Sequence, residues 1–234
     1  MKILFLLPPS EGKNIEWNPG NEVLTYTFDK PNEIAENVTE KDLKCIGNRF
    51  EEGLTLNTQL VNGQTENVSH AMTRYTGVMF NAIDYIGMND AGQSYFEDHF
   101  MIFSGMYGIV KPNDLIGNYK LPIESKGLVK YWKEDITKAL NDSRAEYIVN
   151  LLPLSYMKMI DFKTLIPRLV NINFQVEKAG KIVKMAHGVK KIKGEWIKNI
   201  CEQLGKNSDS DVFKVFGWEK IETDKSIEVN ILHK

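Results

Sequence analysis

Residues 1–13 read MKILFLLPPSEGK, an apolar run that two prolines stop and a polar loop follows. The run Ile3–Leu7 has the length of a buried strand and is too short for the apolar core of a signal peptide. In an α/β sheet, the loop that leaves a strand is the usual place for ligand contacts. It is not a phosphate-binding loop, because the G-x-x-x-x-G-K-[ST] pattern is absent. The loop supplies three candidate catalytic residues, Ser10, Glu11 and Lys13, unless it is a proline-stiffened turn with a solvated acid and base.

Similar short apolar runs, bounded by turn residues, predict the other strands. They are Phe100–Phe103, Tyr147–Leu152, Val170–Glu177, Ile182–Met185 and Ile227–Leu232. Helical patterns predict helices over Glu40–Glu52, Ser69–Ile86, Ser94–His99, Lys126–Leu140 and Val189–Leu204. In the fourth helix, Leu128, Trp132, Ile136 and Leu140 fall four apart and make an apolar stripe that we expect to pack in the core.

Loose alternation of strands and helices predicts an α/β (or α+β) fold, with a mixed sheet flanked by helices. Residues 14–40 and 205–211 look like irregular, polar segments, but neither marks a domain boundary. We therefore expect a single globular domain over residues 1–234, and we favour a monomer.

The overall composition is that of a soluble globular protein of 234 residues with a formal net charge of -2. No segment approaches the roughly 20 apolar residues of a membrane helix. Two distant cysteines predict reduced thiols, which favours a cytoplasmic protein without a membrane partner. A nucleic-acid partner would need a local basic patch, because the charge of the whole chain does not favour one.

A second constellation is Arg74, Tyr75, Thr76 and Gly77, inside a run that is otherwise compatible with a helix. Glycine in a helix costs about 1 kcal/mol relative to alanine, so it often has a packing or contact reason. Arg74 could pair with a phosphate and Tyr75 could stack on a base. The favoured alternative is a close helix crossing at Gly77 with Tyr75 partly buried.

A third constellation lies in residues 103–121, FSGMYGIVKPNDLIGNYKL. Two glycines three apart between apolar residues approximate the hairpin of a helix-hairpin-helix element, which offers backbone N–H groups to a DNA phosphate. The alternative is a turn that needs positive φ at both glycines. The candidate anion-binding residues here are Ser104, Gly105, Tyr107, Gly108 and Lys111.

The fourth constellation is basic. Between Lys181 and Lys198 the chain carries six lysines against the single acid Glu195, with His187-Gly188 ahead of the densest part. Such an imbalance indicates a polyanion partner, although a solvated helix face is the alternative. The candidate contacts are Lys190, Lys191 and Lys193.

The four histidines are scattered and neither cysteine lies beside one, so we predict no metal site and no cofactor.

Six segments in order resemble the YaaA family of bacterial peroxide-stress proteins. They are PPSEGK at 8–13, RYTG at 74–77, FSGMYGIVKPNDLIGNYKL at 103–121, LVKYWKEDI at 128–136, IVNLLPLSY at 148–156 and VKKIKG at 189–194. The resemblance implies a single cytoplasmic α/β domain with a helix-hairpin-helix-like element beside a basic cleft. It also implies binding of duplex or distorted DNA and an association with lower free iron during peroxide stress. The SGMYG turn would be part of the hairpin, and Lys190, Lys191 and Lys193 the edge of the cleft.

The chain departs from the family pattern at two places. Many members have Ser-Pro-Ala-Lys near residues 9–13, where this chain carries the acid Glu11. An arginine is common where this chain has Lys193, and lysine lacks the bidentate fork of arginine. We therefore expect a modest, salt-sensitive affinity for DNA.

Three functions follow as hypotheses. The first is a DNA-binding peroxide-stress protein, in which lysines and backbone amides contact phosphates and Tyr75 or Tyr107 stacks on bases. The second is an enzyme acting on a nucleotide-like or phosphorylated small molecule, with Glu11 as acid or base and Lys13 and Lys191 holding the anion. Direct iron sequestration is the weakest, because the sequence shows no cluster of ligands.

Overall fold

A computed structural model describes residues 2–15, 35, 37–61, 68–185, 188–206, 213, 220–223 and 226–233. Most of the predicted irregular segment 14–40, most of the loop 205–211 and His187 lie outside these ranges. The described elements, in chain order, are β1 (Ile3–Leu7), α2 (Glu40–Leu43), α3 (Asn48–Val61), β2 (Val68–His70), α4 (Ala71–Arg74), α5 (Val78–Ile83), the 3₁₀ helix η1 (Tyr85–Gly87), α6 (Asp90–His99), β3 (Phe100–Ser104), β4 (Gly108–Val110), β5 (Leu115–Gly117), α7 (Leu128–Asp142), β6 (Tyr147–Asn150), α8 (Leu154–Met157), β7 (Arg168–Lys178), β8 (Lys181–Lys184), α9 (Val189–Gly205), β9 (Lys220–Glu222) and β10 (Ser226–His233).

One mixed sheet organises the fold, as predicted. Its order is β4-β3-β1-β6-β7-β10-β9, with β8 paired to β7. The five strands from β3 to β10 are parallel, whereas β4, β8 and β9 pair antiparallel at the margins. Every residue of β1 is buried, which is expected for a central parallel strand covered on both faces.

The strand order reverses around β1. The chain leaves β1 and forms β3 on one side, then returns to form β6 on the other side. In register, Leu6 pairs with Asn150 of β6 and Leu7 pairs with Ile102 of β3. At such a switch point, the connections from two neighbouring parallel strands run in opposite directions, which opens a crevice at the carboxyl ends of the strands. The loops that follow β1, β3 and β6 therefore meet at one edge of the sheet.

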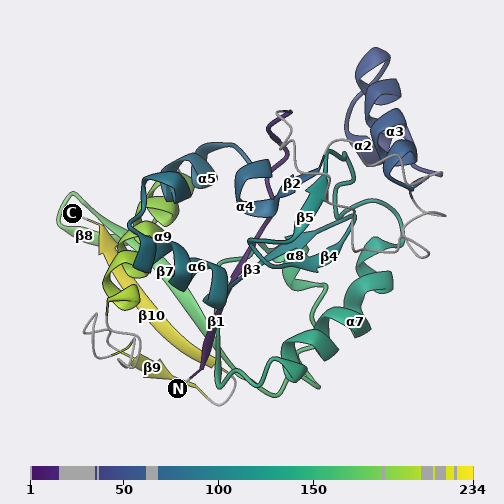
Figure 1. The fold of residues 1–234 in the computed structure, drawn as a ribbon. Coiled ribbons are helices and arrows are strands. Elements are labelled where there is room, and N and C mark those ends of the chain that lie inside the picture. Colours follow the sequence, from purple (N-terminus) through teal and green to yellow (C-terminus); the bar gives the residue numbers. More distant parts are fainter. Residues whose placement is uncertain are drawn as a thin grey trace.

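Helices cover both faces of the sheet (Figure 1). Helices α5 and α6 both pack on α9. On that side Phe5 stacks on Phe100 with ring centroids 4.5 Å apart, and Trp196 of α9 meets the edge of Phe5. Helix α7 packs against β4 and lies across the sheet from this layer. The α7 stripe is confirmed as core at Leu128, Ile136 and Leu140, which are fully buried.

Two predicted helices are wrong as continuous elements. The segment Glu40–Glu52 divides into α2 and α3 because Lys44 takes a left-handed conformation with φ 53° and Gly47 follows with φ 56°. The segment Ser69–Ile86 begins in strand β2, which pairs with β5. It then forms the short helices α4 and α5, which are separated at Gly77 with φ 105°. That φ value is outside the helical region, so Gly77 is the N-cap at which α5 begins. It does not mark a helix crossing, since its close neighbour is Ser10 of the loop after β1.

Candidate functional site

The loop after β1 pairs with the segment between α4 and α5. Lys13 and Tyr75 form an antiparallel bridge, and the Thr76 amide donates to the Gly12 carbonyl at 3.0 Å. A glycine lies at each contact, and the backbone requires glycine only at Gly77, where φ is 105°. A Cβ on Gly12 would lie 2.9 Å from Thr76 Oγ1, and one on Gly77 would lie 2.7 Å from Ser10 Oγ. The predicted segments 10–13 and 74–77 therefore form one structural unit.

Arg74 anchors this unit from below. Its side chain is completely buried, and its Nη1 donates to the carbonyl of Asn14, whose amide donates back to the Arg74 carbonyl at 2.8 Å. Burial lowers the pKa of the guanidinium, and nearby Tyr107 opposes that shift. Because the side chain does not reach the surface, Arg74 supplies positive charge beneath the loop.

Lys13 occupies a box of aromatic rings. Its Nζ lies 4.1 Å from the centre of the Tyr119 ring and 5.7 Å from that of Tyr75, and it donates to the Ser10 carbonyl at 3.3 Å. Burial lowers the pKa of Lys13 to about 7, and Glu11 partly opposes this shift. The amine is thus shared between its charged and neutral forms near neutral pH, as in lysines that act as bases or nucleophiles.

A chain of hydroxyl groups forms the floor beside Lys13. The hydroxyl oxygen of Tyr119 lies 2.6 Å from that of Tyr75 and 2.7 Å from Ser104 Oγ. Ser104 Oγ also accepts from the Tyr107 amide, and the Tyr107 hydroxyl accepts from the Gly117 amide at 2.8 Å. Burial raises the pKa of all three tyrosines well above the usual range, so they stay protonated and serve as hydrogen-bonding groups.

The SGMYG turn joins two antiparallel strands, so its flanks at Ser104 and Gly108 are strands and not helices. Gly108 has φ 73°, but Gly105 does not have a positive φ. The expectation of positive φ at both glycines is therefore wrong. Gly105 is needed for space instead, since a Cβ there would lie 2.1 Å from the Leu121 carbonyl oxygen. The Trp132 indole donates to the Gly105 carbonyl at 2.8 Å and packs over Gly108.

The turn is buried, which limits its contacts with a ligand. Tyr75 and Tyr107 are 2% and 5% exposed, so neither ring presents a free face to a base in this structure. Lys111, by contrast, is exposed in the turn between β4 and β5, where its amide donates to Asp114 Oδ2 at 2.6 Å. The turn therefore supports the loop 10–13 from inside the protein, through the hydrogen bonds that join Ser104, Tyr119 and Tyr75.

The lysines of α9 divide into two groups. Lys190 and Lys191 are exposed in the first turn, and Lys191 pairs with Glu195 at 3.5 Å. Lys193 is half-buried and donates to the Leu151 carbonyl at 3.2 Å. Since the Leu151 amide donates to the Leu6 carbonyl, Lys193 lies at the carboxyl ends of β1 and β6. Burial and nearby Lys184 lower its pKa.

Tyr156 is a site residue that the sequence alone did not single out. It follows β6 in the segment LPLSY and accepts a hydrogen bond from the Ile123 amide. Burial raises its pKa, and the neighbouring Tyr119, Glu124 and Glu11 contribute in the same direction. Its position after a strand that flanks β1 is the signal that would have found it. Tyr156 connects the Lys13 box to the loop that precedes α7.

The family described as peroxide stress protein YaaA matches residues 1–225. The chain belongs to this family. A UPF0246 protein of Rickettsia conorii (strain ATCC VR-613 / Malish 7) is 30% identical over 142 residues, 57% of each chain. A UPF0246 protein of Francisella tularensis subsp. novicida (strain U112) is 30% identical over 164 residues, 65% of each chain. The matched part is thus less than two thirds of the length of either relative. The match to the family over residues 1–225 confirms the resemblance predicted from the six segments.

In this YaaA-family chain, three of the four predicted constellations converge. Residues 10–13, 74–77 and 104–107 share the hydrogen bonds and ring contacts around Lys13. The fourth reaches the same edge of the sheet through Lys193. Lys190, Lys191 and Lys111 remain on the outer surface.

Two kinds of feature are absent from the described residues. Within them, no group of three or more histidine, cysteine, aspartate or glutamate side chains could hold a metal ion. Over the same ranges, no helix is long and apolar enough to cross a membrane.

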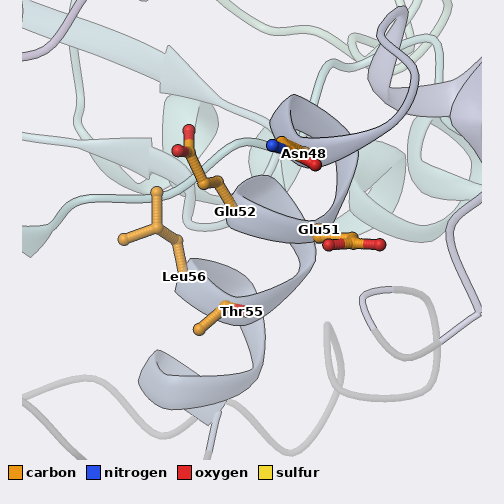
Figure 2. Close-up of a pocket in the computed structure, with 5 residues that line it drawn as sticks. All are labelled: Asn48, Glu51, Glu52, Thr55 and Leu56. Carbon is orange, nitrogen blue, oxygen red and sulfur yellow. The ribbon is translucent and has the colours of Figure 1, made fainter.

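A shallow hollow of about 460 Å³ runs along α3 and is lined by Asn48, Glu51, Glu52, Thr55 and Leu56 (Figure 2). Its lining comes from one helix, and the two carboxylates point to different sides of it. This hollow gives no support to a polyanion or metal site.

Proposed function

We propose that this protein acts in the cytoplasmic response to peroxide and binds DNA, duplex or distorted, through a basic surface on β8 and the start of α9. Membership of the peroxide stress family supports the first part. The observation that carries the second is the exposure of Lys181, Lys184, Lys190 and Lys191 on these two neighbouring elements.

The geometry of this basic surface favours phosphate contacts. Lys184 lies close enough to Lys193 to influence its pKa, so the strand and the helix contribute to one positive region. Mobile ammonium groups contact phosphate oxygens without reading bases, and they release counterions from DNA when they do so. The buried tyrosines take no part in this mode.

The affinity should be modest, because the chain as a whole carries a formal charge of -2 and repels DNA elsewhere on its surface. Glu195 also offsets part of the charge of Lys191. Binding should therefore be measurable at low salt and weaken steeply as salt rises.

The test is fluorescence anisotropy with a labelled duplex and a labelled bubble at low salt. A Lys190→Ala/Lys191→Ala variant should bind about tenfold more weakly, uniformly across sequences, because it loses two phosphate contacts. The matched control is Lys138→Ala/Lys163→Ala, which removes the same charge elsewhere and should bind like the parent. No binding by the parent protein, or equal losses in both variants, would overturn the proposal.

We also propose that this protein lowers free intracellular iron during peroxide stress, as its resemblance to the family implies. Cells that lack the protein should contain more electron-paramagnetic-resonance-detectable free iron after peroxide treatment than cells that express it. Equal iron levels in the two strains would contradict this part without affecting the DNA-binding part.

A second candidate is an enzyme acting on a nucleotide-like or phosphorylated small molecule. The convergence of Lys13, Glu11 and a hydroxyl chain at the switch point of the sheet favours it. Glu11 is exposed beside the box and would serve as acid or base, while Lys13 would hold the anionic group. Lys191, the other predicted anion contact, lies on the outer surface of α9.

A thermal-shift screen of nucleotides and sugar phosphates tests this candidate. Ligands of the Lys13 box should raise the melting temperature of the parent protein but not of a Lys13→Met variant. A compound turned over by the parent should be bound but not converted by a Glu11→Gln variant. A screen with no hits, or turnover that survives Glu11→Gln, would rule it out.

A further inference from the structure

A hollow of about 540 Å³, named the cavity below, lies at the amino-terminal end of α7 and is nearly as open to solvent as the shallow hollow on α3. Its walls come from the loop of residues 123–127, the first two turns of α7 and Lys158, which follows α8. Because α7 covers the opposite face of the sheet from α9, this cavity is separate from the basic surface on β8 and α9 (Figure 1). Its volume is in the range of pockets that bind small molecules.

The end of α7 in this cavity has no side-chain cap. Gly127 occupies the N-cap with φ 92°, and no side chain accepts from the first turn. The first amides of a helix have no partner within the helix, and the helix dipole makes this end positive. The Leu128 amide donates to the Ser125 carbonyl at 3.2 Å, so it is already satisfied. The 15-residue α7 therefore directs the positive end of its dipole, and the first-turn amides after Leu128, towards the cavity.

Ser125 gives an independent indication of a ligand. It lines the cavity, is 2% exposed, and its Oγ has no hydrogen-bond partner within the described residues. Buried hydroxyl groups are nearly always hydrogen-bonded, so an orphan hydroxyl at a cavity wall requires an explanation. The Oγ itself has almost no exposed surface, so the Ser125 side chain would have to rotate towards the cavity before an acceptor oxygen on a bound molecule could satisfy it.

The charge in the cavity is strongly positive. Lys126, Lys130, Lys133 and Lys158 line it, and none of them has a carboxylate within 4.0 Å among the described residues. The one acid in the lining, Glu124, pairs with Lys44 at 3.5 Å. Asp42 lies at the rim, where it accepts from the Lys126 amide at 3.2 Å and from Thr39. Four unpaired ammonium groups thus face one acid that already has a partner.

We propose that this cavity binds a small molecule that carries several phosphate groups, such as a nucleoside triphosphate or an inorganic oligophosphate. Phosphate oxygens would accept from the first amides of α7 and from Ser125 Oγ, and the four lysines would neutralise the negative charge. A single phosphate or carboxylate would leave most of these lysines without a counter-charge. The proposal does not depend on DNA binding or on chemistry at Lys13.

The test is isothermal titration of the full chain with inorganic tripolyphosphate, and with ATP in a second arm, at low salt. One site should be occupied, and a Lys130→Gln/Lys133→Gln variant should bind at least tenfold more weakly. Lys138→Gln, one turn further along the same helix and paired with Asp142, is the matched control and should bind like the parent. Ser125→Ala should weaken binding severalfold at an unchanged melting temperature.

Several outcomes would overturn the proposal. These are no heat with either phosphate, an equal loss in the Lys138→Gln control, or full affinity in the Lys130→Gln/Lys133→Gln variant. Displacement of tripolyphosphate by short duplex DNA, with loss of DNA binding in the same variant, would instead assign the cavity to nucleic acid. The Lys190→Ala/Lys191→Ala variant should bind tripolyphosphate normally, which separates this test from that of the basic surface.

Discussion

The amine of Lys13, which is ordinarily charged, lies near the rings of Tyr75 and Tyr119 and close to the buried Arg74. Burial is the main cause of its lowered pKa of about 7, and Arg74 and Lys120 add like-charge repulsion to it. The face of the Tyr119 ring favours the charged form and offsets part of this cost. The balance makes Lys13 the group in the described site whose charge is most responsive near neutral pH.

This balance predicts how stability depends on pH. Between about pH 7 and the usual pKa of lysine near 10.5, Lys13 is protonated when the chain unfolds but largely neutral when it is folded. Unfolding therefore takes up a proton, so the free energy of unfolding rises with pH across this window and the contribution is lost as pH falls towards 7. Lys13→Met should reduce that slope by up to about one proton between pH 7 and 9.5, measured by urea unfolding.

The control for this experiment is Lys163→Met, which removes an exposed lysine and should leave the slope unchanged. A parent slope that Lys13→Met leaves intact would show that the Lys13 amine stays protonated in the folded protein.

At Gly77, a residue distant in sequence restricts which side chain the position can accept. Alanine at this position would need φ 105° and would place its Cβ 2.7 Å from Ser10 Oγ. Gly77→Ala should lower the free energy of unfolding by about 2–3 kcal/mol. Gly180→Ala is the matched control, since Gly180 also has positive φ but has open space around it, and it should cost about 1 kcal/mol. Equal losses in the two variants would mean that the Ser10 contact is unimportant.

At the scale of elements, α7 holds the buried turn between β3 and β4 through one side chain. The Trp132 indole bonds to the Gly105 carbonyl and its ring covers Gly108. Trp132→Phe keeps an aromatic ring but leaves a buried carbonyl without its donor, which should cost about 1–3 kcal/mol in urea unfolding. Lys138→Ala, on the exposed side of α7, should change stability by less than about 0.5 kcal/mol. A neutral Trp132→Phe would show that the turn is held by packing alone.

The regular elements could be predicted from sequence where the local pattern is strong. The five parallel strands of the central sheet, the strand β8 and the helices α7 and α9 were predicted because short apolar runs and four-residue stripes do not depend on distant partners. The short strands β2, β4, β5 and β9 were missed, since three residues carry too little pattern. The helix predicted over Ser69–Ile86 failed because β2 gains its hydrogen bonds from β5, which lies far along the chain.

In the candidate site, too, local features could be predicted from the sequence and contacts between distant residues could not. Its segments could be named from residue types, because a strand-exit loop and clustered glycines are local signals. Their arrangement could not, because the bridge between Lys13 and Tyr75 and the contact between Lys193 and Leu151 join residues distant in sequence. The burial that separates Lys193 from Lys190 and Lys191 is likewise a property of the folded chain.

At the scale of the whole molecule, a protein of net charge -2 concentrates positive charge at two separate places. One is the basic surface on β8 and α9, and the other is the cavity at the start of α7. The sheet lies between them (Figure 1). This separation predicts that a duplex and an oligophosphate bind independently, each leaving the affinity for the other unchanged.

The most direct test of DNA binding through the basic surface is the salt dependence of duplex affinity. The logarithm of the association constant should fall linearly with the logarithm of salt concentration, with a slope set by the number of phosphates contacted. Lys190→Ala/Lys191→Ala should make that slope shallower by about 2, at roughly 0.9 per lost contact. An affinity that does not change with salt, or a variant slope equal to that of the parent, would contradict the account.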